Sequence, residues 1–211
     1  MRITEIYSSV QGETRFAGLP CTLVRTTGCD LRCGYCDTAY AFHGGQDMDL
    51  DAIGAEVARL GARLVLLTGG EPMLQRDLPA LAARLLAAGH EVMIETSGAH
   101  PLDALPPEVV RIIDVKTPGS GESHRVRWEV IDQARPQDSL KFVLCDEADY
   151  LWAVQAIRAR DLCARAEVLL SPVHGGLDPA TLVTWMLRDR LPARLNLQLH
   201  KYIWPPETRR V

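Results

Sequence analysis

Short apolar runs recur along the chain, and most of them are separated by stretches with helical periodicity. Each run is rich in Leu, Val or Ile and has the length of a buried strand. The runs cover residues 21–25, 63–68, 91–96, 109–115, 140–145, 167–171 and 195–199. Strands that alternate with helices in this way predict an α/β fold with a mostly parallel sheet.

The segment 77–88 has the clearest helical pattern, because Asp77 is a candidate N-cap, Pro79 stands in the first turn and Gly89 follows the end. A complete eightfold barrel typically takes about 250 residues. The 211 residues therefore predict a partial, or reduced, parallel β/α barrel that forms one domain over residues 1–211. Three more segments have helical periodicity and a candidate cap: 49–60 with Asp49 or Asp51, 147–160 with Asp146, and 178–190 with Asp178.

Polar and glycine-rich residues follow the predicted strands. The loops at the carboxyl ends of parallel strands meet at one edge of the sheet, where ligands bind in this architecture. One such loop would be an ordinary turn, but their repetition predicts a shared site at that edge. The sequences are "TGGEP" (68–72), "ETSG" (95–98), "DVKTPGSGE" (114–122), "SPVHGG" (171–176) and "QLHKY" (198–202).

Charge and hydropathy exclude several classes of protein. The formal net charge is −4 and no block of Lys and Arg is present, which argues against nucleic acid and favours a small-molecule ligand. The start of the chain has no apolar signal region, and no run reaches membrane-spanning length. We therefore expect a cytoplasmic protein that does not bind membranes, in which six cysteines are not a disulfide framework.

Three cysteines, Cys29, Cys33 and Cys36, are clustered in "GCDLRCGYCDTAY", while the other three are scattered in apolar contexts typical of buried thiols. The spacing CxxxCxxC can wrap thiolates around one metal centre. A [4Fe–4S] cluster would keep one iron free for a ligand, whereas zinc would need a fourth ligand such as Asp37 or His43. The spacing favours the cluster and leaves zinc as the alternative.

The aromatic Tyr35 before the last cysteine, together with "TGGEP" after a strand, resembles the radical S-adenosylmethionine (SAM) superfamily. The resemblance implies that SAM chelates the open iron of a [4Fe–4S] cluster. Electron transfer to SAM would then release a 5′-deoxyadenosyl radical, which takes a hydrogen atom from the substrate. The protein would position SAM and exclude water, while the cofactors supply the radical chemistry.

The segment "EIYSSVQGETRFAGLPCTLVRTTGCDLRCGYCDTAY" (5–40) resembles the 7-carboxy-7-deazaguanine synthase family, and "ETSG", "DVKTPGSGE" and "HKY" fit the same family. The resemblance implies a lyase that converts 6-carboxy-5,6,7,8-tetrahydropterin to 7-carboxy-7-deazaguanine with loss of ammonia, in queuosine and 7-deazapurine biosynthesis. It also implies Mg²⁺, a flavodoxin or ferredoxin as reductant, and a homodimer. The alternatives are a glycyl-radical enzyme activase and a zinc-binding structural module.

The family pattern assigns substrate contacts to residues whose chemistry suits a carboxylated pterin. A guanidinium such as that of Arg25 can clamp a carboxylate, and a glutamate such as Glu13 can accept hydrogen bonds from an N–H and NH₂ edge. No side chain is assigned a catalytic role, because the cluster and SAM carry the chemistry. The predicted substrate-binding residues are Val10, Gln11, Gly12, Glu13, Arg25, Thr68, His200, Lys201 and Pro206.

The same pattern assigns the cofactor contacts. Cys29, Cys33 and Cys36 would hold the cluster, and Thr38 would bind Mg²⁺, which takes its remaining oxygen ligands from water and substrate. Glycines let the backbone approach SAM, and the carboxylate of Glu71 suits its ammonium group. The predicted SAM-binding residues are Gly69, Gly70, Glu71, Ser97, Asp114, Val115, Lys116, Ser171, Pro172, Val173 and His174. The chain continues past "HKY" as "IWPPETRRV", which leaves the role of its C-terminal extension open.

Overall fold

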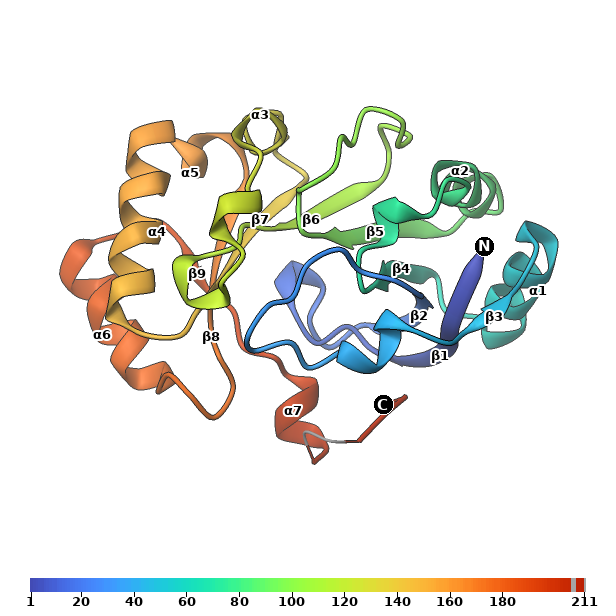
Figure 1. The fold of residues 1–211 in the computed structure, drawn as a ribbon, viewed down its shortest axis with the longest axis horizontal. Helices are drawn as coiled ribbons and strands as arrows, with labels where there is room; N and C mark the ends of the chain where they lie inside the picture. The colour runs from blue at the N-terminus through green and yellow to red at the C-terminus, as the bar shows by residue number, and fades with distance from the viewer. Residues whose placement is uncertain (206–207, 211) are drawn as a thin grey trace.

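The computed structural model describes residues 1–205 and 208–210, and within them the strands form one curved sheet (Figure 1). The spatial order is β3-β1-β2-β4-β5-β6-β7-β8-β9. Neighbours from β2 to β9 pair in parallel, while β1 runs antiparallel to β2 and β3. The strands are β1 (Arg2–Val10), β2 (Pro20–Thr26), β3 (Gln46–Asp47), β4 (Leu64–Gly69), β5 (Glu91–Thr96), β6 (Val110–Asp114), β7 (Ser139–Leu144), β8 (Glu167–Pro172) and β9 (Arg194–Leu195).

The four predicted helices are present, and three of them begin at a predicted cap. Asp49, Asp146 and Asp178 accept hydrogen bonds from backbone N–H groups of the first turn at 2.7–3.0 Å. Asp77 makes no such bond, contrary to the prediction, because its backbone is not extended and Pro79 lacks an N–H. The helices are α1 (Leu50–Leu60), α2 (Leu78–Ala87), α3 (Trp128–Ile131), α4 (Glu147–Arg160), α5 (Leu162–Arg165), α6 (Pro179–Asp189) and α7 (His200–Ile203).

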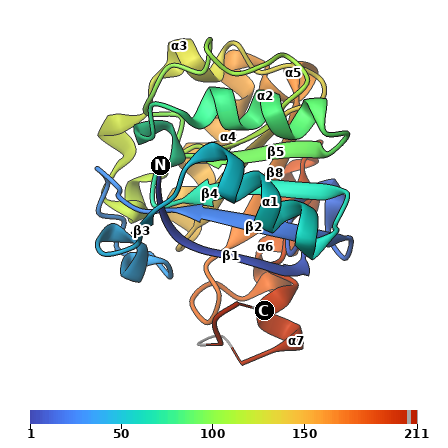
Figure 2. The same cartoon turned by 90° about the vertical axis from the view of Figure 1, so that its right-hand side faces the viewer.

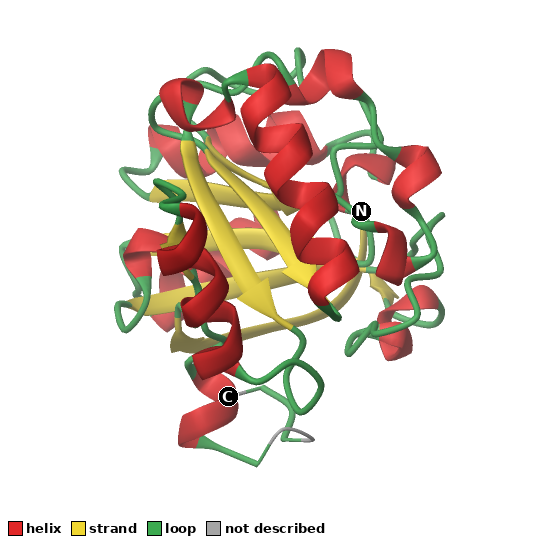
Figure 3. Ribbon diagram, turned by 90° about the vertical axis from the view of Figure 1, so that its left-hand side faces the viewer, coloured by secondary structure: helices red, strands yellow, loops and turns green. Residues whose placement is uncertain are grey.

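Successive residues of the central strands are buried on opposite faces of the sheet. Val65 and Leu67 pack in the large core under the helices, whereas Leu64, Leu66 and Met93 belong to a second cluster on the other face. Figures 2 and 3 show the helices covering the outer face of the curved sheet. Burial on both faces explains why these strands are continuous apolar runs rather than alternating ones.

Three strands differ from the sequence-based expectation, and one of them is the short strand β3, which was not predicted. The run 195–199 forms only a two-residue strand, β9, and then leads into α7. The strand β1 was not predicted, because its sequence is polar at most positions. That polarity has a structural cause: β1 pairs with β2 over seven residue pairs and directs Tyr7 and Val10 toward a cavity. A strand that faces a polar site lacks the apolar signature of a core strand.

The architecture is α/β with a mostly parallel sheet, as predicted, and it forms a partial barrel. The carboxyl ends of β2, β4, β5, β6, β7 and β8 open on one edge of the sheet (Figure 1). Within residues 1–205 and 208–210, no helix has the length and apolar composition needed to cross a membrane.

Candidate active site

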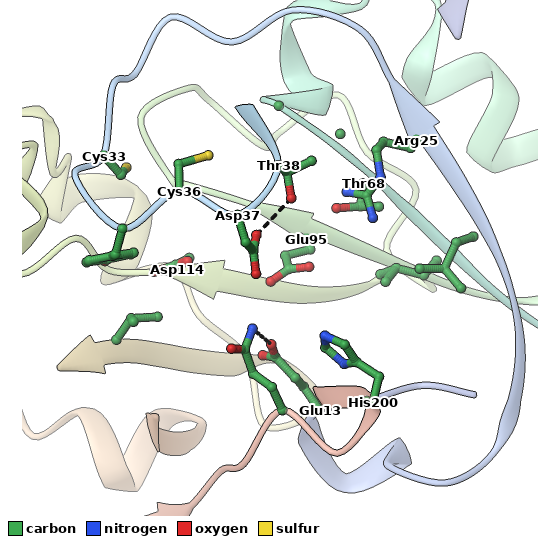
Figure 4. Close-up of a pocket in the computed structure, with 18 of the residues that line it drawn as sticks. Glu13, Arg25, Cys33, Cys36, Asp37, Thr38, Thr68, Glu95, Asp114 and His200 are labelled. Atoms are coloured by element: carbon green, nitrogen blue, oxygen red, sulfur yellow. Dashed lines mark hydrogen bonds between the residues drawn. The ribbon is translucent and has the colours of Figure 1, made fainter. Parts of the chain in front are cut away.

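A cavity of about 640 Å³ lies at the carboxyl edge of the sheet and brings together most of the predicted site residues. The cysteine loop lies at one end of it, and Arg25 and Thr68 lie at the other (Figure 4). The five loops of the predicted strand-end pattern all contribute to its wall, and so do the loops after β1 and β2. The predicted residues that line it are Val10, Gln11, Gly12, Glu13, Arg25, Cys29, Cys33, Cys36, Thr38, Thr68, Gly69, Gly70, Ser97, Asp114, Lys116, Val173, His174, His200 and Lys201.

Four predicted SAM contacts do not line this cavity. Val115 is fully buried in the core, and Ser171 accepts a hydrogen bond from Asn196 at 2.7 Å. Pro172 ends β8 without reaching the cavity. The fourth is Glu71, whose environment is described below. Pro206, a predicted substrate contact, lies outside the described residues.

Glu71 is fully buried, and both of its carboxylate oxygens are occupied by neighbouring loops. One oxygen accepts from Met73 N at 3.0 Å and Thr96 Oγ1 at 2.7 Å. The other accepts from Ser97 N at 2.8 Å and Ser97 Oγ at 2.6 Å. In the structure this carboxylate ties the loop after β4 to the end of β5. Its expected contact with the SAM ammonium stays a prediction.

Replacing Glu71 with Gln should destabilise the protein, because the amide NH₂ would face backbone and hydroxyl donors. An unsatisfied buried donor costs about 1–3 kcal/mol, so we expect the free energy of unfolding in urea to fall by about 2 kcal/mol. The matched control is Glu56→Gln on α1, where an exposed carboxylate pairs with Arg59 at 2.6 Å. The control should leave the unfolding midpoint unchanged. Equal midpoints for the two variants would contradict this account of Glu71.

The cysteine loop packs directly on the glycines that follow β4. Glu71 N donates to Gly28 O at 2.9 Å, and an added Cβ on Gly70 would lie 2.6 Å from Cys29 Cβ. The loop and the "TGG" turn therefore share one backbone interface that leaves no space for a side chain. This close approach requires the glycine at Gly70.

The thiols of the loop are free and line the same end of the cavity (Figure 4). Burial raises the pKa of Cys29, and burial also raises the pKa of Cys33 although the nearby Lys116 opposes this rise. Soft sulfur donors at this spacing fit an iron–sulfur cluster, and binding would displace their protons. Among the described residues, no group of three His, Cys, Asp or Glu side chains is already arranged around one metal position. The donor set fits the cluster, and its thiols would turn toward it on binding.

At the far end, Arg25 is held by Glu5 and Tyr7. Arg25 Nε donates to Glu5 Oε1 at 2.9 Å, and Arg25 Nη2 donates to Tyr7 Oη at 3.4 Å. Burial opposes the charged form, but the nearby tyrosines and Glu5 outweigh it and raise the pKa of Arg25. The guanidinium is therefore a fixed cation whose remaining N–H groups can bind an anion in the cavity.

Glu13 accepts three hydrogen bonds from side chains, of which Lys141 and Gln198 line the cavity and Asn196 is buried behind it. Its donors are Lys141 Nζ at 2.8 Å, Gln198 Nε2 at 3.1 Å and Asn196 Nδ2 at 3.3 Å. Burial would raise the pKa of Glu13, but the charge and hydrogen bond of Lys141 outweigh it, so the pKa is lowered. Glu13 is therefore an ionised acceptor at neutral pH, with a fixed orientation.

The start of α7 closes the cavity beside Glu13. Leu199 N donates to Gly12 O at 2.8 Å, and a Cβ on Gly12 would overlap the His200 ring. Burial lowers the pKa of His200 despite the charge of Glu13, so the ring is neutral at neutral pH. Lys201 Nζ contacts Asp37 Oδ2 at 2.6 Å, and Asp37 accepts from Thr38 Oγ1 at 2.9 Å. Asp37 is thus engaged with Lys201, which weakens its case as a zinc ligand.

Several cavity residues were missed from the sequence. Lys141 and Glu95 lie inside apolar runs, where a charged residue is itself a signal that the strand faces a polar site. Tyr40, which lines the cavity, and Glu5, which holds Arg25 and Tyr40 from behind, lie at positions without such a signal. The C-terminal extension also reaches the cavity: Arg209 lies over the Tyr40 ring at 4.1 Å, and Arg210 Nε is 3.4 Å from Glu5 Oε2.

Known proteins share both the sequence and the fold. Residues 23–115 match the sequence profile of the radical SAM superfamily. The 7-carboxy-7-deazaguanine synthase of Koribacter versatilis is 46% identical, with 100% of both chains covered. This chain belongs to the 7-carboxy-7-deazaguanine synthase family. A second family member, from Chlorobaculum tepidum, is 42% identical and covers 100% of this chain and 97% of its own length.

The family fold is also seen in a solved structure. The crystal structure of QueE from Escherichia coli aligns with a TM-score of 0.78 at 24% identity and covers 94% of each chain. Membership of the radical SAM superfamily implies a [4Fe–4S] cluster and SAM as cofactors. The family assignment replaces both alternatives, the glycyl-radical enzyme activase and the zinc-binding structural module.

Proposed function

We propose that this protein is a radical SAM lyase that converts 6-carboxy-5,6,7,8-tetrahydropterin to 7-carboxy-7-deazaguanine with loss of ammonia. The observation that carries the proposal is that one cavity has metal-binding thiols at one end and charged groups suited to a carboxylated pterin at the other. Three free thiols and two glycines line one end, and Arg25 with the ionised Glu13 lines the other. The family relationship over the full chain supports the same reaction.

At the cofactor end, Cys29, Cys33 and Cys36 hold the cluster, and the backbone of Gly69 and Gly70 approaches the methionine part of SAM. Ser97, Asp114, Lys116 and His174 border the space for its ribose and adenine. Asp114 Oδ1 is buried and has no partner among the described residues, so it is free to accept from a ligand hydroxyl. When bound, the cluster and SAM supply the radical that removes a hydrogen atom from the substrate.

At the substrate end, Arg25 binds the carboxylate of the pterin through its free guanidinium N–H groups. Glu13 accepts hydrogen bonds from the N–H and NH₂ edge of the pyrimidine ring, and Gln11 offers a mixed donor and acceptor group beside it. His200 and Lys201 border the same space from α7. Together these groups fix the orientation of the ring relative to the cofactor end.

Thr38 lies between the two ends, and we assign it to Mg²⁺ (Figure 4). Its hydroxyl donates to Asp37 Oδ1, so the hydroxyl oxygen keeps lone pairs of the type that Mg²⁺ binds. Substrate and water oxygens would complete the coordination. A flavodoxin or ferredoxin as electron donor, and a homodimer in solution, complete the proposal.

Turnover by anaerobically reconstituted protein tests the function. With SAM, dithionite, Mg²⁺ and 6-carboxy-5,6,7,8-tetrahydropterin, we expect a product with the absorbance and mass of 7-carboxy-7-deazaguanine, one ammonia per product, and no product without SAM. Chelation of Mg²⁺ should lower the rate. Absence of product from protein that carries an intact cluster would refute the proposal.

A further inference from the structure

Lys141 is a buried cation at the centre of the cavity wall. It lies on β7 between Leu140 and Phe142, which are both fully buried, and it is itself 4% exposed. Its position in the apolar run "SLKFVL" places a charge where the strand pattern calls for an apolar residue. A buried lysine is costly unless it is paired, so its partners indicate why it is there.

Three carboxylates from different elements surround this ammonium. Lys141 Nζ donates to Glu13 Oε2 at 2.8 Å, also donates to Glu95 Oε1, and lies 3.9 Å from Asp114 Oδ2. Glu13 follows β1, Glu95 lies on β5, and Asp114 ends β6. Figure 4 shows these three acidic groups around one part of the cavity. Lys141 on β7 therefore links Glu13, after β1, to the carboxylates of β5 and β6 near the cofactor end.

The balance of charge makes Lys141 the counter-ion of Glu13 and Glu95. Lys116 is paired with Asp114 at 2.8 Å, and Lys201 is paired with Asp37 at 2.6 Å. The remaining titratable neighbour of Glu13 is His200, whose ring is neutral at neutral pH. Among the described residues, no other cation forms an ion pair with Glu13 or Glu95. Without Lys141, two carboxylates would face each other in a partly desolvated wall, and one would take up a proton.

We propose that Lys141 is a positioning residue for substrate recognition, which holds Glu13 ionised and oriented so that its oxygens accept hydrogen bonds from the pterin ring. The inference rests on the proposed function and assigns to it a residue that does not itself have to touch the substrate. Glu95 is the second anchor of the lysine and fixes its position between β5 and β7. The hydrogen bonds of Asn196 and Gln198 complete the orientation of Glu13.

Lys141→Met in the reconstituted holoenzyme tests this role, because methionine keeps the length and removes the charge. We expect the KM for the pterin at pH 7 to rise at least about 10-fold, the equivalent of one lost charge-assisted hydrogen bond, while kcat changes less. The rise in KM should shrink as pH increases, because hydroxide restores the ionised form of Glu13. In the wild-type protein, where Glu13 is already ionised at pH 7, the KM should not fall in this way as pH increases.

Glu13→Gln separates positioning from a general structural effect. Once Glu13 is neutral, removing Lys141 should add little to the KM, so the two substitutions should be strongly non-additive. Lys141→Met combined with Glu95→Gln retains charge balance and provides a variant that folds if the single one does not. In that double variant Glu13 has lost both its counter-ion and the neighbouring negative charge, so we expect a smaller pH-dependent rise in KM than in Lys141→Met.

An unchanged KM in Lys141→Met would overturn the inference, as would a KM raised equally at every pH, or additive effects with Glu13→Gln. Failure of both Lys141 variants to fold or to retain iron would also overturn it, because the role would then be structural. A wild-type protein that makes no product refutes the proposed function instead. The two failures are therefore distinguishable.

Discussion

Gly70→Ala is expected to abolish retention of the iron–sulfur cluster and to lower product formation at least about 100-fold, the scale expected for a misplaced reacting group. A Cβ at this position would overlap Gly28 O and would lie 2.6 Å from Cys29 Cβ and 2.8 Å from Gly28 C. The cysteine loop cannot shift to make room without loss of the hydrogen bond from Glu71 N to Gly28 O at 2.9 Å. The substitution therefore acts on the position of the first cysteine, although it removes no ligand.

The matched control for Gly70→Ala lies in the cysteine loop itself. Gly34 stands between Cys33 and Cys36, does not adopt a positive φ, and has open space where a Cβ would be added. Gly34→Ala should therefore retain cluster and activity. Iron and sulfide content per chain, the visible absorption of the cluster and the turnover rate are the measurements. Equal iron content and turnover in the two variants would show that the packing of Gly70 on Cys29 is not required.

The central strands were predictable from sequence for a physical reason. Residues such as Val65 and Leu66 are buried on opposite faces, so the whole run is apolar and stands out from its surroundings. The strand β1 was not predictable in the same way, because its sequence is polar at most positions. Its polar side chains reflect the cavity that they face. The residue types along β1 therefore follow the polar cavity that the strand faces rather than the apolar pattern of a core strand.

The candidate site was predictable where a motif carries the chemistry and less so where packing decides it. The cysteine loop and "TGG" meet at one end of the cavity, as the resemblance to the radical SAM superfamily implied. The side chain of Glu71, however, is taken up by Thr96 and Ser97, which lie 25 and 26 residues away. Local sequence cannot show whether a carboxylate faces a ligand or a neighbouring loop. Lys141 was missed for the related reason that its three partners come from separate elements.

Arg25→Met is expected to lower kcat/KM for the carboxylated pterin about 100-fold, because it removes a charged, bidentate anion contact of roughly 3 kcal/mol. The effect should appear mainly in KM. Arg25→Lys should recover little of the loss, because an ammonium keeps the charge without the planar pair of donors. Arg59→Met is the matched control, since Arg59 lies on α1 and pairs only with Glu56 among the described residues. It should leave both kinetic constants unchanged.

A pterin without the carboxylate makes the test of Arg25 specific. If the guanidinium acts by binding that carboxylate, the truncated pterin should bind the wild-type protein and Arg25→Met with equal affinity. The competing explanation is structural: Glu5 is 7% exposed and depends on Arg25 for its 2.9 Å ion pair, so the substitution could disturb the wall itself. In that case both pterins would lose affinity to the same degree. The measurement is the dissociation constant of each pterin for each of the two proteins. If Arg25 recognises the carboxylate, Arg25→Met weakens binding of the carboxylated pterin alone. If Arg25 only supports Glu5, the substitution weakens binding of both pterins.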